Sequence, residues 1–315
     1  MHRLRERSVR MEKTAPRKRK IEVPLLVLTV PFFLIVVLFS YVPLWGWSIA
    51  FVDYVPGRSI LESAFAGFKY FHRLFDSTSD FGTVLRNTLV LSFLHLICSP
   101  LPVLLAIMIT NLRSGRFAKF IQTVTSFPNF ISWIIVYSVF FSFFSIDDGM
   151  LNKLLYGTLH WIKEPSNLLS DPRWTWWFMT LATVWKTVGW TAIIYIAAIA
   201  GIDQEQYQAA EVDGASRFKQ AIHITIPGIM PTFTILLLLN IGNMLNVGFD
   251  QYYVFGNALV QEKIDVIDTY TYRVGLLNMD FSYSTAAGIF KSLVSVILLF
   301  TANFVTRRTS GRSIM

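Results

Sequence analysis

The side chains best suited to catalysis or metal binding are few and scattered in this sequence. The five histidines are spread over the whole chain: His2, His72, His95, His160 and His223. No pair has the spacing of a zinc site, and the single cysteine, Cys98, excludes a disulfide within the chain. A phosphate-binding loop of the form G-x-x-x-x-G-K-[ST] is also absent. The sequence therefore predicts a protein that is not an enzyme and has no metal site or cofactor of its own.

Asparagines inside an apolar run form a second group of candidates. Asn240, Asn243 and Asn246 recur every third residue in the run 228–249, so on one helix they would form a slowly rotating stripe. Amides suit the hydroxyls of a sugar, but membrane helices also use them to contact one another. The pattern leaves both a substrate pathway and a helix contact open. Asp250, just outside the run, either binds substrate or ends the span.

Two lysines also lie within apolar segments. Lys186 is near the middle of the segment 174–202, where an ionisable side chain is a functional candidate. Tryptophans crowd its outer side, so the alternative is that Lys186 snorkels to the interface. Lys291, in the segment 281–306, has the same two interpretations. If both lined a pathway, an anionic sugar such as a uronate would be a suitable cargo.

The segments that carry these residues are long enough to cross a bilayer. The chain has 315 residues, of which 53% are hydrophobic and 15% charged, which is too apolar for a soluble protein of this size. Six segments exceed the roughly 20 residues that a span needs: about 24–44, 84–112, 119–146, 175–201, 228–249 and 284–306. We predict an all-α membrane protein with six transmembrane helices, comprising a tail at 1–22, a transmembrane domain at 23–306 and a tail at 307–315.

Lysine and arginine placement predicts the orientation. Basic residues concentrate in the tail 1–20, the connection 113–119, the segment 204–227 and the C-terminal tail. Both termini are therefore expected in the cytoplasm. The basic cluster Arg17–Lys20 is expected to bind anionic membrane lipid, and no basic face with interleaved aromatics indicates nucleic acid.

One polar segment, QEQYQAAEVDGASRFKQAIHITIP (Gln204–Pro227), separates the fourth and fifth spans. It predicts two short amphipathic helices that break at Gly214, where the missing side chain permits the bend. Asp213 is expected to cap the second helix, and Pro227 is expected to end it. Tyr207, Ala209, Ala210 and Phe218 would form a small apolar ridge. A helix of this kind suits the groove of a protein partner.

The pattern A-A-x-x-D-G, nine residues, then I-x-I-P resembles the signature loop of the membrane subunits of ATP-binding-cassette importers. That loop docks into the ATPase, so the resemblance implies a cytoplasmic coupling-helix loop at 204–227, between spans four and five. The implied contact residues are Tyr207, Gln208, Ala209, Ala210, Asp213, Gly214, Ala215, Phe218 and Pro227. Gln208 stands at the first position of the usual E-A-A triplet, which removes a charge from this contact.

Further stretches look like permeases that import complex saccharides, a group that includes alginate importers: PLWGWSIAFVDYVPG, AGFKYF, FGTVLRNTLVLS, LNVGFDQYYVF and VIDTYTYRVGL. This resemblance implies a permease of the bacterial inner membrane that forms half of the pathway for an oligo- or polysaccharide, acidic ones such as alginate included. It implies as partners a second homologous permease, two ATPase subunits that bind ATP and Mg, and an extracytoplasmic solute-binding protein. A permease for another solute and an ion-driven secondary transporter remain alternatives. The outer loops are rich in acids, so a docking partner is expected to present basic residues.

Overall fold

The computed structural model describes residues 23–146, 148–161, 164–165 and 167–310, so the Arg17–Lys20 cluster lies outside the described residues. These residues form helices and connections without a strand, apart from one isolated bridge between Val52 and Phe65. The predicted all-α class is confirmed. The chain divides into two compact units, Met1–Ser48 and Ile49–Met315.

The first unit carries the first predicted span. Helix α1 (Val23–Val36) continues into a π-helical turn (Val37–Tyr41) and then a 3-10 helix (Val42–Phe51). The stretch Val27–Phe51 is long and apolar enough to cross a membrane. Large apolar side chains point outward along it, with Phe32 69% and Phe39 77% exposed. Such a surface suits lipid or another membrane helix.

The second unit carries four more helices of spanning length: Phe81–Thr110 (α3, Phe81–Ile97, with α4, Leu101–Thr110), Thr175–Ala200 (α8), Arg217–Gly242 (α10, Arg217–Gln220, through α11, Ile226–Gly242) and Phe281–Arg308 (in α15, Phe281–Ser310). They correspond to the second, fourth, fifth and sixth predicted spans. Among the described residues this makes five candidate spans, by length and composition.

The third predicted span is broken. Helix α5 (Gly115–Ser126) and a 3-10 turn (Phe127–Phe130) meet α6 (Trp133–Phe144) at an angle of 103°. The third predicted span, 119–146, is therefore not one continuous helix, and the predicted six spans result if this bent pair counts as one. Pro128 lacks an N–H donor and starts the break. Ser132 then begins α6 by accepting a hydrogen bond from the Ile135 amide.

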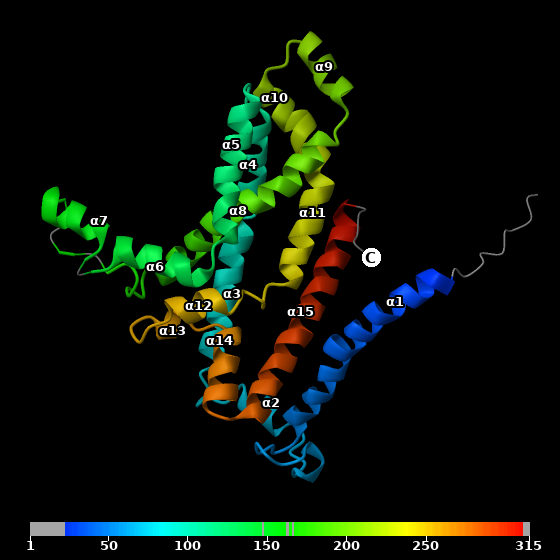
Figure 1. Cartoon of the computed structure of the whole chain (residues 1–315), viewed down its shortest axis with the longest axis vertical. Coiled ribbons are helices and arrows are strands. Elements are labelled where there is room, and N and C mark those ends of the chain that lie inside the picture. Colours follow the sequence, from blue (N-terminus) through cyan, green and yellow to red (C-terminus); the bar gives the residue numbers. More distant parts are fainter. Residues whose placement is uncertain (1–22, 147, 162–163, 166, 311–315) are drawn as a thin grey trace, which may run out of the picture. The chain divides into compact units, whose positions relative to one another are not determined.

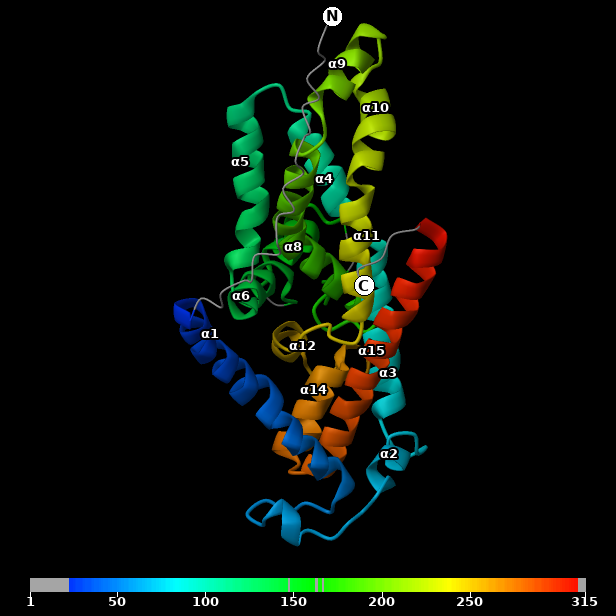
Figure 2. The same ribbon diagram turned by 90° about the vertical axis from the view of Figure 1, so that its right-hand side faces the viewer.

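The connections of the second unit gather at two ends. Helices α9 (Gln204–Val212) and α10 lie at the same end as the turn between α4 and α5, whereas α2 (Lys69–Arg73) and α14 (Ile267–Tyr272) lie at the opposite end (Figures 1 and 2). This arrangement agrees with the predicted grouping of the basic loops on one side. The remaining short helices are Ile60–Glu62, α7 (Met150–Asn152), Lys153–Thr158, α12 (Asp250–Phe255), α13 (Gln261–Ile264) and Arg273–Leu277.

Three buried clusters hold the second unit together. One joins α2, α3, α14 and α15 around Phe81 and Tyr283, and a second joins α3, α6, α8 and α12 around Leu91 and Phe255. The third packs α4, α8 and α11 around Tyr195. Helices α3 and α8 each belong to two of the three clusters, so these two helices connect the parts of the unit.

Candidate functional site

The polar loop 204–227 folds as two helices with a break at Gly214, as predicted. Asp203 caps α9 by accepting a hydrogen bond from the Glu205 amide at 2.9 Å. Gly214 then adopts φ +74°, a left-handed conformation that only glycine takes without strain. The expected role of Asp213 was wrong, because Asp213 ends α9 and the side chain of Ser216 caps α10.

Pro227 does not end the second helix. The chain stays helical from Arg217 to Gly242, and a π-helical turn over Ala221–Thr225 directly precedes α11. Pro227 occupies the first turn of α11, and the wider turn before it accommodates a residue that has no N–H to donate. The second half of the loop and the fifth span therefore form one continuous helix, Arg217–Gly242, which the sequence did not predict.

Two hydrogen bonds fasten the loop to the spans. The Tyr207 hydroxyl lies 2.9 Å from Thr225 Oγ1. This hydrogen bond connects α9 to the turn that directly precedes α11. The Arg217 guanidinium donates to the Asn111 carbonyl at 2.6 Å, at the C-terminal end of α4. A cation at a helix C-terminus also complements the helix dipole. Arg217 was missed as a site residue, because nothing in its local sequence shows that α4 ends beside it.

The loop also presents apolar side chains to its surroundings. Phe218 is 74% and Val212 is 89% exposed, and Gln208 and Ala209 are exposed beside them. Ala210 and Ala215 are half-buried. The predicted apolar ridge is thus altered: Tyr207 is turned to Thr225 and Val212 takes its place on the surface. Large exposed apolar groups on a polar loop suit contact with a protein.

A cavity of about 430 Å³ with a mixed polar and apolar lining lies among α3, α8 and α11. Asn240, Asn243 and Asn246 all line it, although they do not share one helix face. Helix α11 ends at Gly242, Asn243 folds back to donate to the Leu239 carbonyl at 3.0 Å, and Asn246 lies beyond the helix. The predicted stripe on a helix 228–249 was wrong in form, yet the structure brings the three amides to one space.

Helix α8 contributes a row of hydroxyls to this cavity that sequence reasoning missed. Thr183, Thr187 and Thr191 are spaced by four residues, and all three line the cavity. The spacing was a usable signal, because residues four apart share one face of a helix. The Thr183 hydroxyl also bonds the buried side chain of Gln251 at 2.7 Å. Asp250, its neighbour, is exposed at the start of α12 and is not among the lining residues.

Lys186 does not line the cavity. Its ammonium donates to the carbonyls of Pro128, Asn129 and Ile131 at 3.1, 2.8 and 2.6 Å, so its three donors are used. The residue is buried, so it does not snorkel to the interface. Gly189, one turn further along α8, touches the same bend, since a Cβ there would lie 2.1 Å from the Thr125 carbonyl oxygen. Lys186 therefore stabilises the broken third span.

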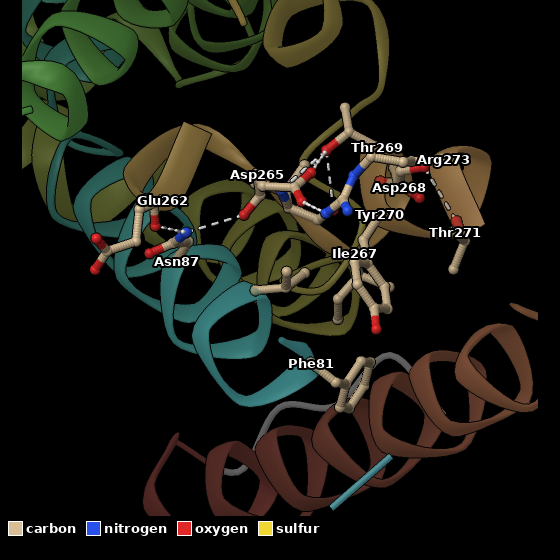
Figure 3. A network of polar contacts seen from close by, with 12 residues as sticks. Phe81, Asn87, Glu262, Asp265, Ile267, Asp268, Thr269, Tyr270, Thr271 and Arg273 are labelled. Atoms are coloured by element: carbon tan, nitrogen blue, oxygen red, sulfur yellow. Dashed lines mark hydrogen bonds and ion pairs between the residues drawn. The ribbon is translucent and has the colours of Figure 1, made fainter. Parts of the chain in front are cut away.

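Lys291 is also engaged. It forms an ion pair with Asp268 of α14, which joins α14 to α15. Figure 3 shows the adjoining network, in which Asn87 of α3 donates to the carbonyls of Glu262 at 2.8 Å and Asp265 at 3.0 Å. The Asp265 carboxylate pairs in turn with Arg273. These contacts fix the N-terminal half of α3 against the segment 262–273.

Acids of the connections at this end are also paired within the chain. Lys69 donates to Asp53 at 2.8 Å and Tyr70 donates to it at 2.7 Å. These two bonds hold the pKa of the Asp53 carboxyl below its usual value. Asp280 pairs with Arg73 at 2.7 Å. A docking partner therefore meets fewer free carboxylates than the sequence suggested.

Comparison with known proteins gives consistent matches over most of the chain. The family described as binding-protein-dependent transport system inner membrane component matches residues 100–311. Protein LplB of Bacillus subtilis (strain 168) is 42% identical, over 90% of this chain and 88% of that protein. The polygalacturonan/rhamnogalacturonan transport system permease protein YteP of the same strain is also 42% identical, over 86% and 84%.

Solved structures match the fold closely. A bacterial ABC transporter involved in the import of the acidic polysaccharide alginate superposes with a TM-score of 0.82 at 34% identity, over 91% of this chain and 96% of that chain. A bacterial alginate ABC transporter in complex with alginate pentasaccharide-bound periplasmic protein gives 0.83 at 34% identity, over 93% and 96%.

Proposed function

The chain belongs to the family of binding-protein-dependent transport system inner membrane components, and on that premise we propose that its cargo is an oligo- or polysaccharide that contains uronic acid residues. The cavity among α3, α8 and α11 supports the proposal. Its lining combines amides and hydroxyls with apolar side chains, and no described lining residue is Lys, Arg, Asp or Glu. Amide and hydroxyl groups are suited to the many hydroxyls of a sugar.

The acidic character of the cargo rests on the relatives rather than on the cavity. The two lysines that would have favoured an anion, Lys186 and Lys291, are engaged with carbonyls and with Asp268. Support for uronic acids comes instead from YteP, a polygalacturonan/rhamnogalacturonan permease, and from the alginate transporter. In this proposal the chain supplies hydrogen bonds to the sugar, and charge recognition belongs to its partners.

The proposed assembly contains four kinds of partner contact: a second permease that completes the pathway, two ATPase subunits, an extracytoplasmic solute-binding protein and membrane lipid. ATP and Mg belong to the ATPases, since the sequence of this chain has no phosphate-binding loop. The exposed Phe218 and Val212 of the coupling loop support docking to an ATPase groove. Both chain termini and this loop are assigned to the cytoplasm by the distribution of basic residues.

Force from the ATPases would reach the spans by two routes. Arg217 connects the loop to the end of α4 through Asn111, and the continuous helix from Arg217 to Gly242 carries the movement toward Asn240 and Asn243. The hydrogen bond between Tyr207 and Thr225 keeps α9 attached to the N-terminal part of that helix. Nucleotide binding then biases a two-state rearrangement of the cavity.

Reconstitution of the complete transporter tests this function. The chain is assembled with its second permease, ATPases and binding protein in proteoliposomes, and uptake of oligogalacturonates is compared with uptake of neutral arabino-oligosaccharides of equal length. We expect ATP-dependent uptake of the acidic series at the higher rate. Uptake of the neutral series alone would contradict the uronic acid assignment, and uptake of neither would contradict a carbohydrate cargo.

A further inference from the structure

His95 is a histidine of the cavity wall whose ring has no hydrogen-bond partner in the described part of the chain. It lies in the last turn of α3, and its Nε2 atom is buried without a partner. Buried polar atoms are nearly always hydrogen-bonded, because leaving one unpaired costs free energy. The ring nevertheless borders a cavity wide enough for a ligand. Nε2 itself is enclosed, so rotation of the ring about its Cβ–Cγ bond is what would turn this unpaired nitrogen to a ligand in the cavity.

Two hydroxyls of the wall are already engaged as donors. The Ser92 hydroxyl donates to the Thr88 carbonyl at 2.7 Å, and the Thr187 hydroxyl donates to the Thr183 carbonyl at 2.8 Å. Each hydroxyl then offers only lone pairs to a ligand. A sugar hydroxyl both donates and accepts, so its recognition also needs free donors. A neutral imidazole carries one N–H and one lone pair, and rotation about its Cβ–Cγ bond presents either edge.

We propose that His95 contacts the carbohydrate cargo directly and hydrogen-bonds its hydroxyls as a neutral ring. The inference rests on the proposed function, since it takes the cavity to be the carbohydrate pathway. The absence of Lys, Arg, Asp and Glu from the described lining favours hydrogen bonding over charge pairing. Apolar neighbours such as Leu96 and Val184 limit competition from water.

Three variants in the reconstituted transporter test the assignment. His95→Leu removes the hydrogen-bonding groups at similar volume, and His95→Gln keeps a donor and an acceptor. Ser295→Ala is the matched control, because Ser295 also has a buried unpaired polar atom but lies outside the cavity lining. Loss of one or two hydrogen bonds predicts uptake reduced about five- to tenfold in His95→Leu. His95→Gln should retain most uptake, and Ser295→Ala all of it.

Cysteine protection makes the test independent of assembly defects in His95→Leu. His95→Cys in a Cys98→Ser background should react with a small maleimide, and oligogalacturonate should slow that reaction. Uptake by His95→Leu within twofold of the parent, or a cysteine at position 95 that cargo does not protect, would overturn the assignment. If Asn240→Ala and Asn246→Ala reduce uptake in that case, the pathway itself stands; if they do not, the cavity is not the pathway.

Discussion

Replacement of Lys186 by methionine should open the bend in the broken third span. The Lys186 ammonium uses all three donors on the carbonyls of Pro128, Asn129 and Ile131. These carbonyls belong to a 3-10 turn and its extended exit, where the helical ladder is interrupted. Methionine fills a similar volume but leaves the three acceptors without this donor.

The magnitude follows from the number of bonds. A hydrogen bond to a charged group contributes about 1.5 kcal/mol at the low end, so three contribute about 4–5 kcal/mol. Part of this loss of free energy is offset in the methionine variant, because the variant no longer buries a charge. We expect a net cost of about 2–3 kcal/mol for the closed bend, which corresponds to a roughly 30- to 150-fold larger open population.

Thiol labelling measures that population. Ser126 is buried at the end of α5, beside the bend. The variant Ser126→Cys in a Cys98→Ser background gives a single buried thiol whose reaction with a membrane-permeant maleimide reports opening. Lys186→Met should raise the labelling rate by the same factor as the open population, roughly 30- to 150-fold. Lys69→Met, which removes an exposed lysine of the opposite connections, is the control and should leave the rate unchanged. An unchanged rate in Lys186→Met, in a correctly assembled complex, would refute this account of the bend.

Two further predictions concern the coupling loop. Gly214→Val forces a β-branched residue to φ +74°, which costs about 1–3 kcal/mol, so co-purification of the ATPases should fall sharply; Gly115→Val, at a position with open space and ordinary φ, should not affect it. Arg217→Ala removes the hydrogen bond to the Asn111 carbonyl and should reduce uptake about fivefold while ATP hydrolysis continues. Lys219→Ala is the control for the lost positive charge. An equal loss of uptake in that variant would show that charge, rather than the bond to Asn111, is what matters.

The sequence predicted those features that depend on local composition. Five apolar spans and the break at Gly214 follow from run length and from a residue that tolerates a left-handed backbone. Whether a proline breaks its helix could not be predicted from local composition. Pro128 breaks its helix and Pro227 does not, although both stand in apolar surroundings. What decides between them is the partner of the freed carbonyls, which for Pro128 is Lys186, 58 residues away.

In the candidate site, too, local sequence predicted some features, and others depend on contacts between distant parts of the chain. The three asparagines were predicted from spacing alone, but their common cavity depends on the chain turning back after Gly242. The threonines of α8 had an equally clear spacing. A threonine hydroxyl in a helix can bond its own backbone, as Thr187 does, so the spacing alone did not indicate a site. His95 could not have been found from spacing, since its significance comes from a partner that the fold does not supply.

Helix α8 connects all parts of this site. Lys186 and Gly189 hold the bend of the third span, while Thr183 and Thr187 on an adjacent face line the cavity. Residues three and four apart share neighbouring faces of a helix, so one rigid element serves both. The C-terminal end of α8 leads through Asp203 directly into the coupling loop. A displacement of the loop that moves α8 must therefore move the cavity wall and the bend together, which is a physical basis for coupling the proposed cargo site to the loop.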